Sequence, residues 1–244
     1  MKVVIASIKR NSRRLKAMAE NKGFDPVFVS TLKVVPLDVS DKLNSFIYDE
    51  KFSWIVFSSS TAASFFIRIN RLTRVLGEAK VAAVGSGTSG FLQRSGIKVD
   101  FTPSKYTTET LAEELPVSRG SRIILARSED GNDRAEMILQ KRGAITYRLN
   151  LYRTSFVNRP LNRRRVEGAK LIVFGSSKEV QGFENRLSIS GIKDFKDKVI
   201  ASCIGPLTKK TALKMGYRVI DIPKAYTYSS LFAMLGDLRN EGRI

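Results

Sequence analysis

The sequence contains no histidine and a single cysteine, Cys203, among its 244 residues. The absence of histidine excludes His-ligated metal sites and the Ser-His and Cys-His pairs that activate nucleophiles. One cysteine excludes a disulfide within the chain and favours a cytoplasmic protein, with Cys203 as core packing. Any acid or base in a reaction must therefore come from Tyr, Lys, Asp, Glu or Cys.

Long hydrophobic runs are also missing. No apolar run approaches the roughly 18 residues that a membrane span needs. The run in "MKVVIASIKR" (1–10) is too short for a signal peptide. We therefore expect no membrane segment. The hydrophobic fraction of 43% still allows a sizeable core, in one large domain or two small ones.

Acidic residues are few: 23 Asp and Glu stand against 42 Lys and Arg, which gives a net charge of +19. A charge of this size concentrates anions near the protein and speeds their arrival. It points to nucleic acid, an anionic membrane or a polyanionic small molecule as a partner. The other explanation for this charge is an organism whose proteins are generally basic, so that Lys and Arg only solvate the surface.

What the sequence does contain is an internal repeat. Gly85 and Gly205 lie 205 − 85 = 120 positions apart, and this offset aligns the segments around them without a gap. The aligned segments are 81–111 with 201–231, 3–23 with 123–143 and, at an offset of 117, 54–66 with 171–183. The chain is therefore predicted to be two copies of one structural plan.

The first glycine turn, "VGSGTSG", has the G-x-G-x-x-G spacing of dinucleotide-binding loops. The repeat argues against that function, because Gly87 and Gly90 correspond to Leu207 and Lys210 in the second copy. The acidic residue expected about 20 positions later is also missing, since Asp100 comes too early. Both copies keep only a strand, a tight glycine turn and a threonine at the start of a helix.

Strands and helices alternate along each copy. In the first copy we expect strands at about 2–7, 27–34, 53–58, 80–84 and 97–101, and helices near 11–22, 40–49, 60–70, 87–95 and 107–115. Several strands are continuous apolar runs, which is typical of parallel strands covered on both faces. The pattern predicts an α/β protein with doubly wound parallel sheets, whose ligands bind at the carboxyl ends of the strands.

Four turns follow predicted strands and open helices: "FSSSTAA", "VGSGTSG", "FGSSKE" and "IGPLTKK". Helix N-termini attract carboxylates and phosphates through unpaired N–H groups and a positive dipole end. Taken singly, the Ser and Thr side chains are better explained as helix caps, which need no ligand. The glycines are expected where the backbone approaches a ligand or adopts an unusual dihedral angle. Four such turns together favour a shared anionic ligand.

Several weak motifs, in order and spacing, resemble the uroporphyrinogen-III synthase family over nearly the whole chain. They are "IVFSSSTAASFF", "AAVGSGTSGFLQRSG", "ITYRLNLYRT", "LIVFGSS", "CIGPLTKKTALKMG" and two "P-x-x-Y-T" segments. The resemblance implies two similar domains, one of residues 1–34 plus 156–244 and the other of 36–154, joined by two strands with a ligand cleft between them. The crossovers would be "KVVP" (33–36) and "LYRTSFVNRP" (151–160).

The resemblance further implies cyclisation of hydroxymethylbilane with loss of water and inversion of its last pyrrole, without a cofactor or metal. The substrate carries eight carboxylates, which gives the charge of +19 a small-molecule explanation. Tyr152 in "LYRT" matches the family's candidate for assisting hydroxyl departure, and an aromatic packed at the hinge explains it as well. The matching substrate-binding positions are Ser59, Thr61, Gly85, Thr88, Ser176, Lys178, Gly205 and Thr208. Thr61 stands where the family often has Arg, so Lys178 is the candidate for that carboxylate contact.

Two other functions fit the same features. A basic two-lobed α/β protein could also be a nucleic-acid-binding module. The sequence, however, shows no RNP-like strand and no DNA-reading motif. A non-catalytic two-domain protein that binds an anionic metabolite would share every expected structural feature. For the synthase we expect a cytoplasmic monomer whose partner is a small polyanionic tetrapyrrole.

Overall fold

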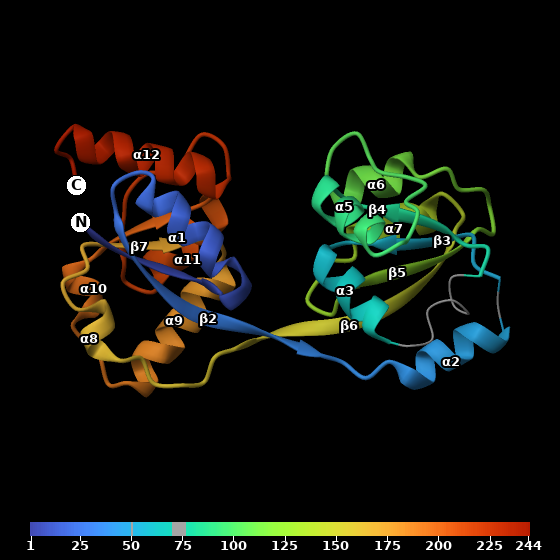
Figure 1. Ribbon diagram of the computed structural model, residues 1–244, viewed down its shortest axis with the longest axis horizontal. Helices are drawn as coiled ribbons and strands as arrows, with labels where there is room; N and C mark the ends of the chain where they lie inside the picture. Colours follow the sequence, from blue (N-terminus) through green and yellow to red (C-terminus); the bar gives the residue numbers. More distant parts are fainter. Residues whose placement is uncertain (50, 70–76) are drawn as a thin grey trace. The chain divides into compact units, whose positions relative to one another are not determined.

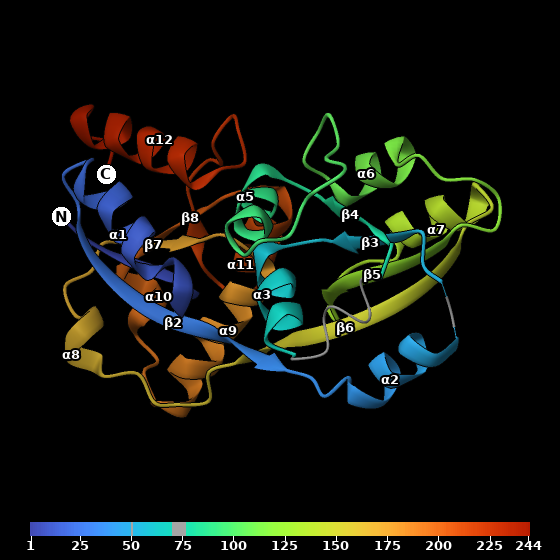
Figure 2. The ribbon, with the colours of Figure 1, turned by 45° about the vertical axis from the view of Figure 1, so that its right-hand side comes forward.

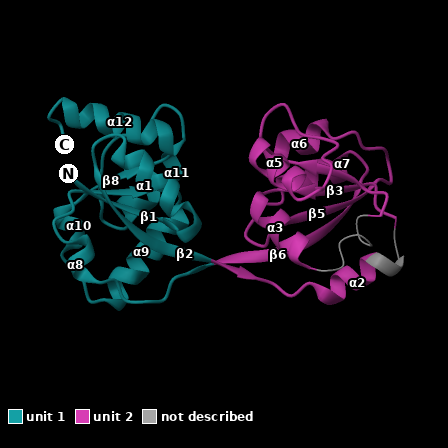
Figure 3. Cartoon of the chain, viewed as in Figure 1, with its two compact units in different colours: residues 1–33, 155–244 teal, residues 34–154 magenta. Residues whose placement is uncertain are grey.

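The computed structural model of the chain describes residues 1–49, 51–69 and 77–244 (Figure 1). The chain divides into two compact units, which Figure 3 colours separately. Unit 1 contains residues 1–33 and 155–244, and unit 2 contains residues 34–154. The chain passes from one unit to the other twice, within strand β2 (Asp25–Pro36) and within strand β6 (Ile145–Phe156).

Unit 2 is built on strands in the order β4-β3-β5-β6, and each neighbouring pair is parallel. Its other strands are β3 (Trp54–Phe57), β4 (Lys80–Ala83) and β5 (Arg122–Ser128). Its helices are α2 (Ser40–Asp49), α3 (Ser60–Arg68), α5 (Ser86–Arg94), α6 (Thr108–Glu114) and α7 (Arg134–Lys141). Strand β3 is buried along its whole length, which explains why it has no polar alternation.

The two faces of the unit 2 sheet are covered by different helices. Ile55 and Phe57 of β3 pack with side chains of α2, α3 and α5, whereas Trp54 and Val56 pack with those of α6 and α7. Successive side chains of a strand point to opposite faces, so one short apolar run serves both cores. Helices α6 and α7 lie together in both ribbon views (Figure 1, Figure 2).

Unit 1 repeats this plan with strands in the order β2-β1-β7-β8-β9, again with parallel pairs. Its other strands are β1 (Lys2–Ile8), β7 (Leu171–Phe174), β8 (Ile200–Cys203) and β9 (Arg218–Val219). Its helices are α1 (Ser12–Glu20), α8 (Arg163–Val166), α9 (Ser177–Ile189), α10 (Phe195–Lys198), α11 (Pro206–Lys214) and α12 (Tyr228–Asn240), with a 3₁₀ turn at Lys9–Asn11. Side chains of α1 and α12 pack on one face of the sheet, and those of α8 to α11 on the other.

The internal repeat is confirmed by the strands. Strand β1 and strand β5 begin and end 120 positions apart, as do β2 and β6. The pairing register shifts after Ser7 in one pair and after Arg127 in the other, which is again the same place in the repeat. The predicted α/β class with parallel strands is confirmed as well.

The strand expected at 97–101 does not form. Within this segment only Phe101 makes a bridge, to Ala82 of β4. The Asp100 carboxylate accepts the Val81 N–H at 2.9 Å, which a carbonyl of a neighbouring strand would otherwise accept. In unit 1 the corresponding position is Ile220, which has no carboxylate, and the short strand β9 forms beside β8. The prediction of a full strand was therefore wrong. The segment keeps backbone hydrogen bonds to β4 from the Asp100 N–H to the Val81 carbonyl and from the Ala83 N–H to the Phe101 carbonyl, whereas the Val81 N–H goes to the Asp100 side chain.

Candidate functional site

The predicted turns lie at the carboxyl ends of strands and start helices, as expected. In unit 2, Ser59 caps α3 and accepts the Ala62 N–H at 3.1 Å. In unit 1, Ser176 caps α9 and accepts the Glu179 N–H at 3.2 Å. The capping interpretation of both serines is confirmed. Each hydroxyl also keeps the capacity to donate a hydrogen bond.

Gly85 and Gly205 occupy the N-cap positions of α5 and α11 without a side-chain cap. Their backbone is extended, with φ of −156° and −165°, so the expectation of an unusual dihedral angle was wrong. Space inside the protein does not require glycine at these positions either, because an added Cβ would make only ordinary van der Waals contacts. A Cβ on Gly85 would lie 3.4 Å from the ring of Tyr106, and one on Gly205 would lie 3.6 Å from that of Tyr226.

The two tyrosines beside these glycines are exposed, Tyr106 by 63% and Tyr226 by 60%. They belong to the repeated "P-x-x-Y-T" segments, whose threonines cap α6 and α12. An exposed aromatic ring therefore lies against each glycine turn, at the edge where both parallel-sheet units place their helix N-termini. The repeat signalled this pair, but the sequence did not show that the rings face solvent.

The three threonines of the turns are buried. Thr88 and Thr208 lie in the first turns of α5 and α11 and are less than a tenth exposed. Thr61 lies in the first turn of α3, and its Oγ1 has no hydrogen-bond partner within the described residues. A buried hydroxyl without a partner is costly, so Thr61 has an unused capacity to bind. Lys178, its counterpart in α9, is half-buried.

Tyr152 lies on β6, and the structure brings it to Ser59. The two hydroxyl oxygens are 3.1 Å apart, and the Tyr152 ring stacks on Phe65 of α3 at 5.7 Å between ring centroids. Only 8% of the residue is exposed. The register shift in β6 places Tyr152 opposite Ser128, at the position that Leu32 occupies in unit 1. In unit 2 the Tyr152 phenol therefore lies beside the N-terminus of α3, whereas unit 1 has the alkyl side chain of Leu32 at the corresponding position.

Unit 1 contains a buried carboxyl group that was not predicted from the sequence. Glu179 accepts hydrogen bonds from Ser7 Oγ at 2.6 Å, from the Gly175 N–H at 2.7 Å and from Tyr228 Oη at 3.2 Å. Burial raises the pKa of Glu179, although these hydrogen bonds act in the opposite direction. The cluster ties together β1, the turn after β7 and the helices α9 and α12. Its members are up to 221 positions apart, so no local pattern announced it.

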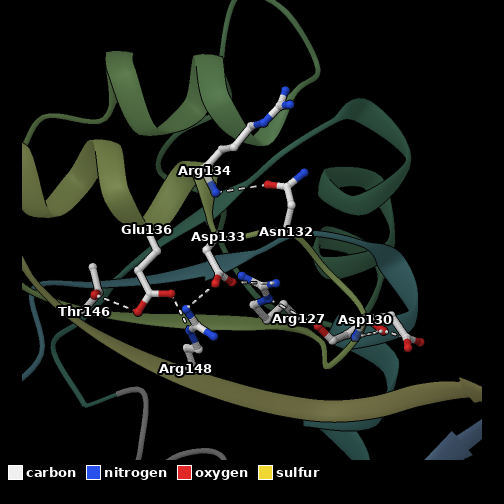
Figure 4. Close-up of polar contacts among 9 residues, drawn as sticks. Arg127, Asp130, Asn132, Asp133, Arg134, Glu136, Thr146 and Arg148 are labelled. Atoms are coloured by element: carbon white, nitrogen blue, oxygen red, sulfur yellow. Dashed lines mark hydrogen bonds and ion pairs between the residues drawn. The ribbon is translucent and has the colours of Figure 1, made fainter.

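A second unpredicted cluster lies in unit 2 and joins Arg127, Asp133, Glu136 and Arg148 (Figure 4). Arg148 binds Glu136 through Nε and Asp133 through a terminal nitrogen at 3.0 Å. The hydrogen bond to Glu136 raises the pKa of Arg148 above its usual value. Arg127 lies 3.7 Å from the same Asp133 and is 8% exposed.

The predicted site residues fall into two sets. Ser59, Thr61, Gly85, Thr88 and Tyr152 belong to unit 2, and the others belong to unit 1. Each set lies at carboxyl ends of parallel strands, where helix N-termini present N–H groups to an anion. Within the described residues no group of three or more His, Cys, Asp or Glu is placed to hold a metal ion. No helix in that part of the chain has the length and apolar character that a membrane crossing requires.

Known proteins share both the sequence and the fold. The family model described as "Uroporphyrinogen-III synthase HemD" matches residues 13–233. A "Porphyrin biosynthesis protein HemD" from Ruminiclostridium josui is 27% identical over 96% of this chain and 48% of its own length. A "Putative uroporphyrinogen-III synthase" from Methanocaldococcus jannaschii is 25% identical over 98% of this chain and 99% of its own length. The chain thus spans about half the length of the first of these relatives and nearly all of the second.

Solved structures show the same fold at low sequence identity. The uroporphyrinogen-III synthetase of Helicobacter pylori matches with a TM-score of 0.65 and 14% identity, over 98% of this chain and 99% of that one. A mutant uroporphyrinogen III synthase from Thermus thermophilus matches with a TM-score of 0.61 and 17% identity, over 99% of both chains. These structural similarities show the fold. Membership of the family is shown by the match of residues 13–233 to the family model.

Proposed function

The chain belongs to the uroporphyrinogen-III synthase family, and we propose that it cyclises hydroxymethylbilane to uroporphyrinogen III in heme biosynthesis. The reaction releases water and inverts the terminal pyrrole ring, so the enzyme acts as a lyase. The observation that carries the proposal is the family match across residues 13–233, which spans both units.

Loss of water is the first chemical step of the proposed reaction. The pyrrole nitrogen lone pair expels the hydroxyl group, whose oxygen takes a proton, and an azafulvene cation remains. Tyr152 is the proposed proton donor. Its hydrogen bond with Ser59 supports the assignment, because a hydroxyl held at a helix N-terminus can stabilise the phenolate left behind. The cation is then attacked by the substituted carbon of the terminal ring, and the spiro intermediate rearranges to the type III macrocycle.

Binding of the bilane carboxylates is the second task. The N-termini of α3, α5, α9 and α11 offer N–H groups, and Ser59, Thr61, Thr88, Ser176, Lys178 and Thr208 are the proposed side-chain contacts, with close backbone approach at Gly85 and Gly205. The net charge of +19 favours capture of such a polyanion. Catalysis then consists largely of holding a linear tetrapyrrole so that one carbon meets its partner.

The decisive experiment supplies enzymatically generated hydroxymethylbilane and separates type I from type III uroporphyrin after oxidation. We expect type III product. Spontaneous closure gives type I, so type I alone would remove the synthase proposal. The nucleic-acid alternative is not favoured by the family match, and it requires sub-micromolar nucleic-acid binding at physiological salt without bilane turnover.

The remaining expectations extend this proposal. We propose a cytoplasmic monomer that works without a metal or organic cofactor. We also propose that residues 1–34 plus 156–244 and residues 36–154 are its two domains. Size measurement in solution tests the monomer, and metal chelation during the bilane assay tests the independence from metal.

A further inference from the structure

A cavity of about 160 Å³ opens in unit 2 next to the predicted site residues, since its lining residues Ser58 and Val84 directly precede Ser59 and Gly85. It lies where β3, β4 and β5 end, on the face that α6 and α7 cover. Its floor consists of the buried side chains Val56, Val84, Leu111, Leu125 and Leu139. Its polar lining is made by Ser58, Thr108, Arg127, Ser128 and Asn132. A cavity with an apolar floor and one buried cation suits a small amphipathic anion.

Arg127 supplies the charge of this cavity. Its Nε donates to the Ser128 carbonyl at 3.2 Å, and its terminal nitrogen lies 3.7 Å from Asp133. That distance exceeds the roughly 2.7–2.9 Å of a charge-assisted hydrogen bond. Asp133 is bound more closely by Arg148, at 3.0 Å (Figure 4). Since a guanidinium has five N–H donors, Arg127 keeps donors for a ligand.

The internal repeat shows what happens at the same place in unit 1. There Ser7 stands in place of Arg127, and Tyr228 stands in place of Thr108. The partly buried Tyr228 ring packs against the core, and its hydroxyl reaches Glu179 and Ser7. A Cβ on Gly175 would lie only 1.9 Å from that hydroxyl, so the tyrosine fills the available space. In unit 1 an aromatic ring fills this space. In unit 2 the space is open and an arginine lines it.

We infer that the cavity of unit 2 binds a short aliphatic carboxylate, with the carboxylate on Arg127 and the methylene groups on Val84, Leu111 and Leu125. A protein cavity of about 150 Å³ can hold a benzene molecule, so this cavity of about 160 Å³ has room for an acetate or propionate group. The ligand has two candidate sources: a side chain of the bilane, which rests on the proposed function, or a free monocarboxylate. Arg127 is a binding residue in either case.

The test uses sodium propionate and this 244-residue chain with labelled methyl groups. We expect saturable NMR shifts of the methyl groups of Val84, Leu111 and Leu125, with a dissociation constant on the order of 1–10 mM because the ligand is small. Arg127→Gln removes the cation, and Thr108→Tyr closes the cavity as in unit 1. Each variant is expected to raise the dissociation constant of propionate at least tenfold. Absence of saturable shifts in the wild-type protein at 100 mM propionate overturns the inference.

Arg134→Gln is the matched control. Arg134 is 75% exposed and lies seven residues beyond Arg127, so the substitution removes the same charge outside the cavity. Propionate binding should stay unchanged in this variant. If it weakens as much as in Arg127→Gln, the anion is attracted by the general positive charge and the cavity site is refuted. Thr108→Tyr keeps the test independent of charge and of any loss of stability at Arg127.

Bilane kinetics of the same variants separate the two sources. If a side chain of the bilane occupies the cavity, KM rises at least tenfold in Arg127→Gln and Thr108→Tyr, while Arg134→Gln keeps the wild-type KM. Propionate binding with an unchanged KM assigns the cavity to a free monocarboxylate. If the wild-type protein does not turn over the bilane at all, the proposed function fails, whereas the propionate titration still decides the cavity.

Discussion

At the residue scale, Tyr152 combines two roles that one substitution separates. Tyr152→Phe keeps the ring on Phe65 but removes the hydroxyl beside Ser59. We expect single-turnover rates to fall about 10²-fold, at the low end for a general acid, because the pyrrole itself expels the hydroxyl group. The product should stay type III, and stability should fall by about 1 kcal/mol, the contribution of one hydrogen bond.

Tyr147→Phe is the matched control for this prediction. Tyr147 lies on the same strand, and its hydroxyl accepts a hydrogen bond from Arg122 at 2.6 Å. Loss of that hydroxyl should lower stability by a similar amount and leave turnover unchanged. Wild-type turnover in Tyr152→Phe would remove the acid role and leave Tyr152 as a packing aromatic.

Thr61 offers a second prediction, because its buried hydroxyl has no partner within the described residues. Thr61→Val removes the unpaired polar atom and keeps the shape of the side chain. We expect stability to rise by about 1 kcal/mol, since an unsatisfied buried hydroxyl costs roughly 1–3 kcal/mol. If the hydroxyl binds substrate, KM rises at the same time. Denaturant unfolding and bilane kinetics measure both effects, and a drop in stability would contradict the prediction.

Glu179 gives a prediction on pH. Burial raises its pKa in the folded protein above the usual 4.5, so folding favours the protonated form. The stabilisation is complete below about pH 4.5 and is lost as the pH rises through the folded pKa. Glu179→Gln keeps the shape without the charge. The wild type should therefore lose stability relative to this variant as the pH is raised from 4 to 8, in urea unfolding series of both proteins. A difference that does not change with pH would show that the folded pKa is not raised.

At the element scale, substitution of Gly85 shows whether the turn before helix α5 needs glycine for folding or for substrate binding. Gly85 has an extended backbone, and an added Cβ would make only van der Waals contact with Tyr106. Gly85→Ala should therefore fold with a stability within about 0.5 kcal/mol of wild type. We expect its KM for the bilane to rise, because the added methyl group keeps substrate from the backbone N–H groups of the turn.

Gly87→Ala in the same helix is the control. Nothing lies within 4 Å of a Cβ at Gly87, and alanine is the better helix former. This variant should gain about 0.5–1 kcal/mol and keep its KM. An unchanged KM in Gly85→Ala would show that substrate does not approach this turn.

At the scale of the whole molecule, the net charge of +19 predicts binding that depends on salt. Screening acts within about 10 Å at 0.1 M ionic strength. KM for the bilane should rise as salt is increased from about 0.02 to 0.3 M, while single-turnover chemistry at saturating substrate changes little. A matched series with sucrose controls for viscosity. A KM independent of salt would assign the charge to surface composition and not to substrate capture.

The elements that depend on neighbouring residues could be predicted from the amino-acid sequence. A buried parallel strand requires a continuous apolar run, so β3 and β7 were predictable, and a helix start requires a local cap, so Ser59 and Ser176 were as well. The repeat was visible because both copies meet the same local requirements at the same spacing.

Contacts between side chains that are distant in the sequence could not be predicted and are known from the folded structure. The Ser59–Tyr152 pair joins residues 93 positions apart, and the Ser7–Glu179 hydrogen bond joins residues 172 apart. The loss of the strand at 97–101 also depends on the position of the Asp100 carboxylate beside β4. These outcomes depend on the pairing of distant strands, the register shifts of β2 and β6, and the burial of polar groups. None of these has a local sequence pattern, because a hydrogen bond depends on distance in space and not on distance along the chain.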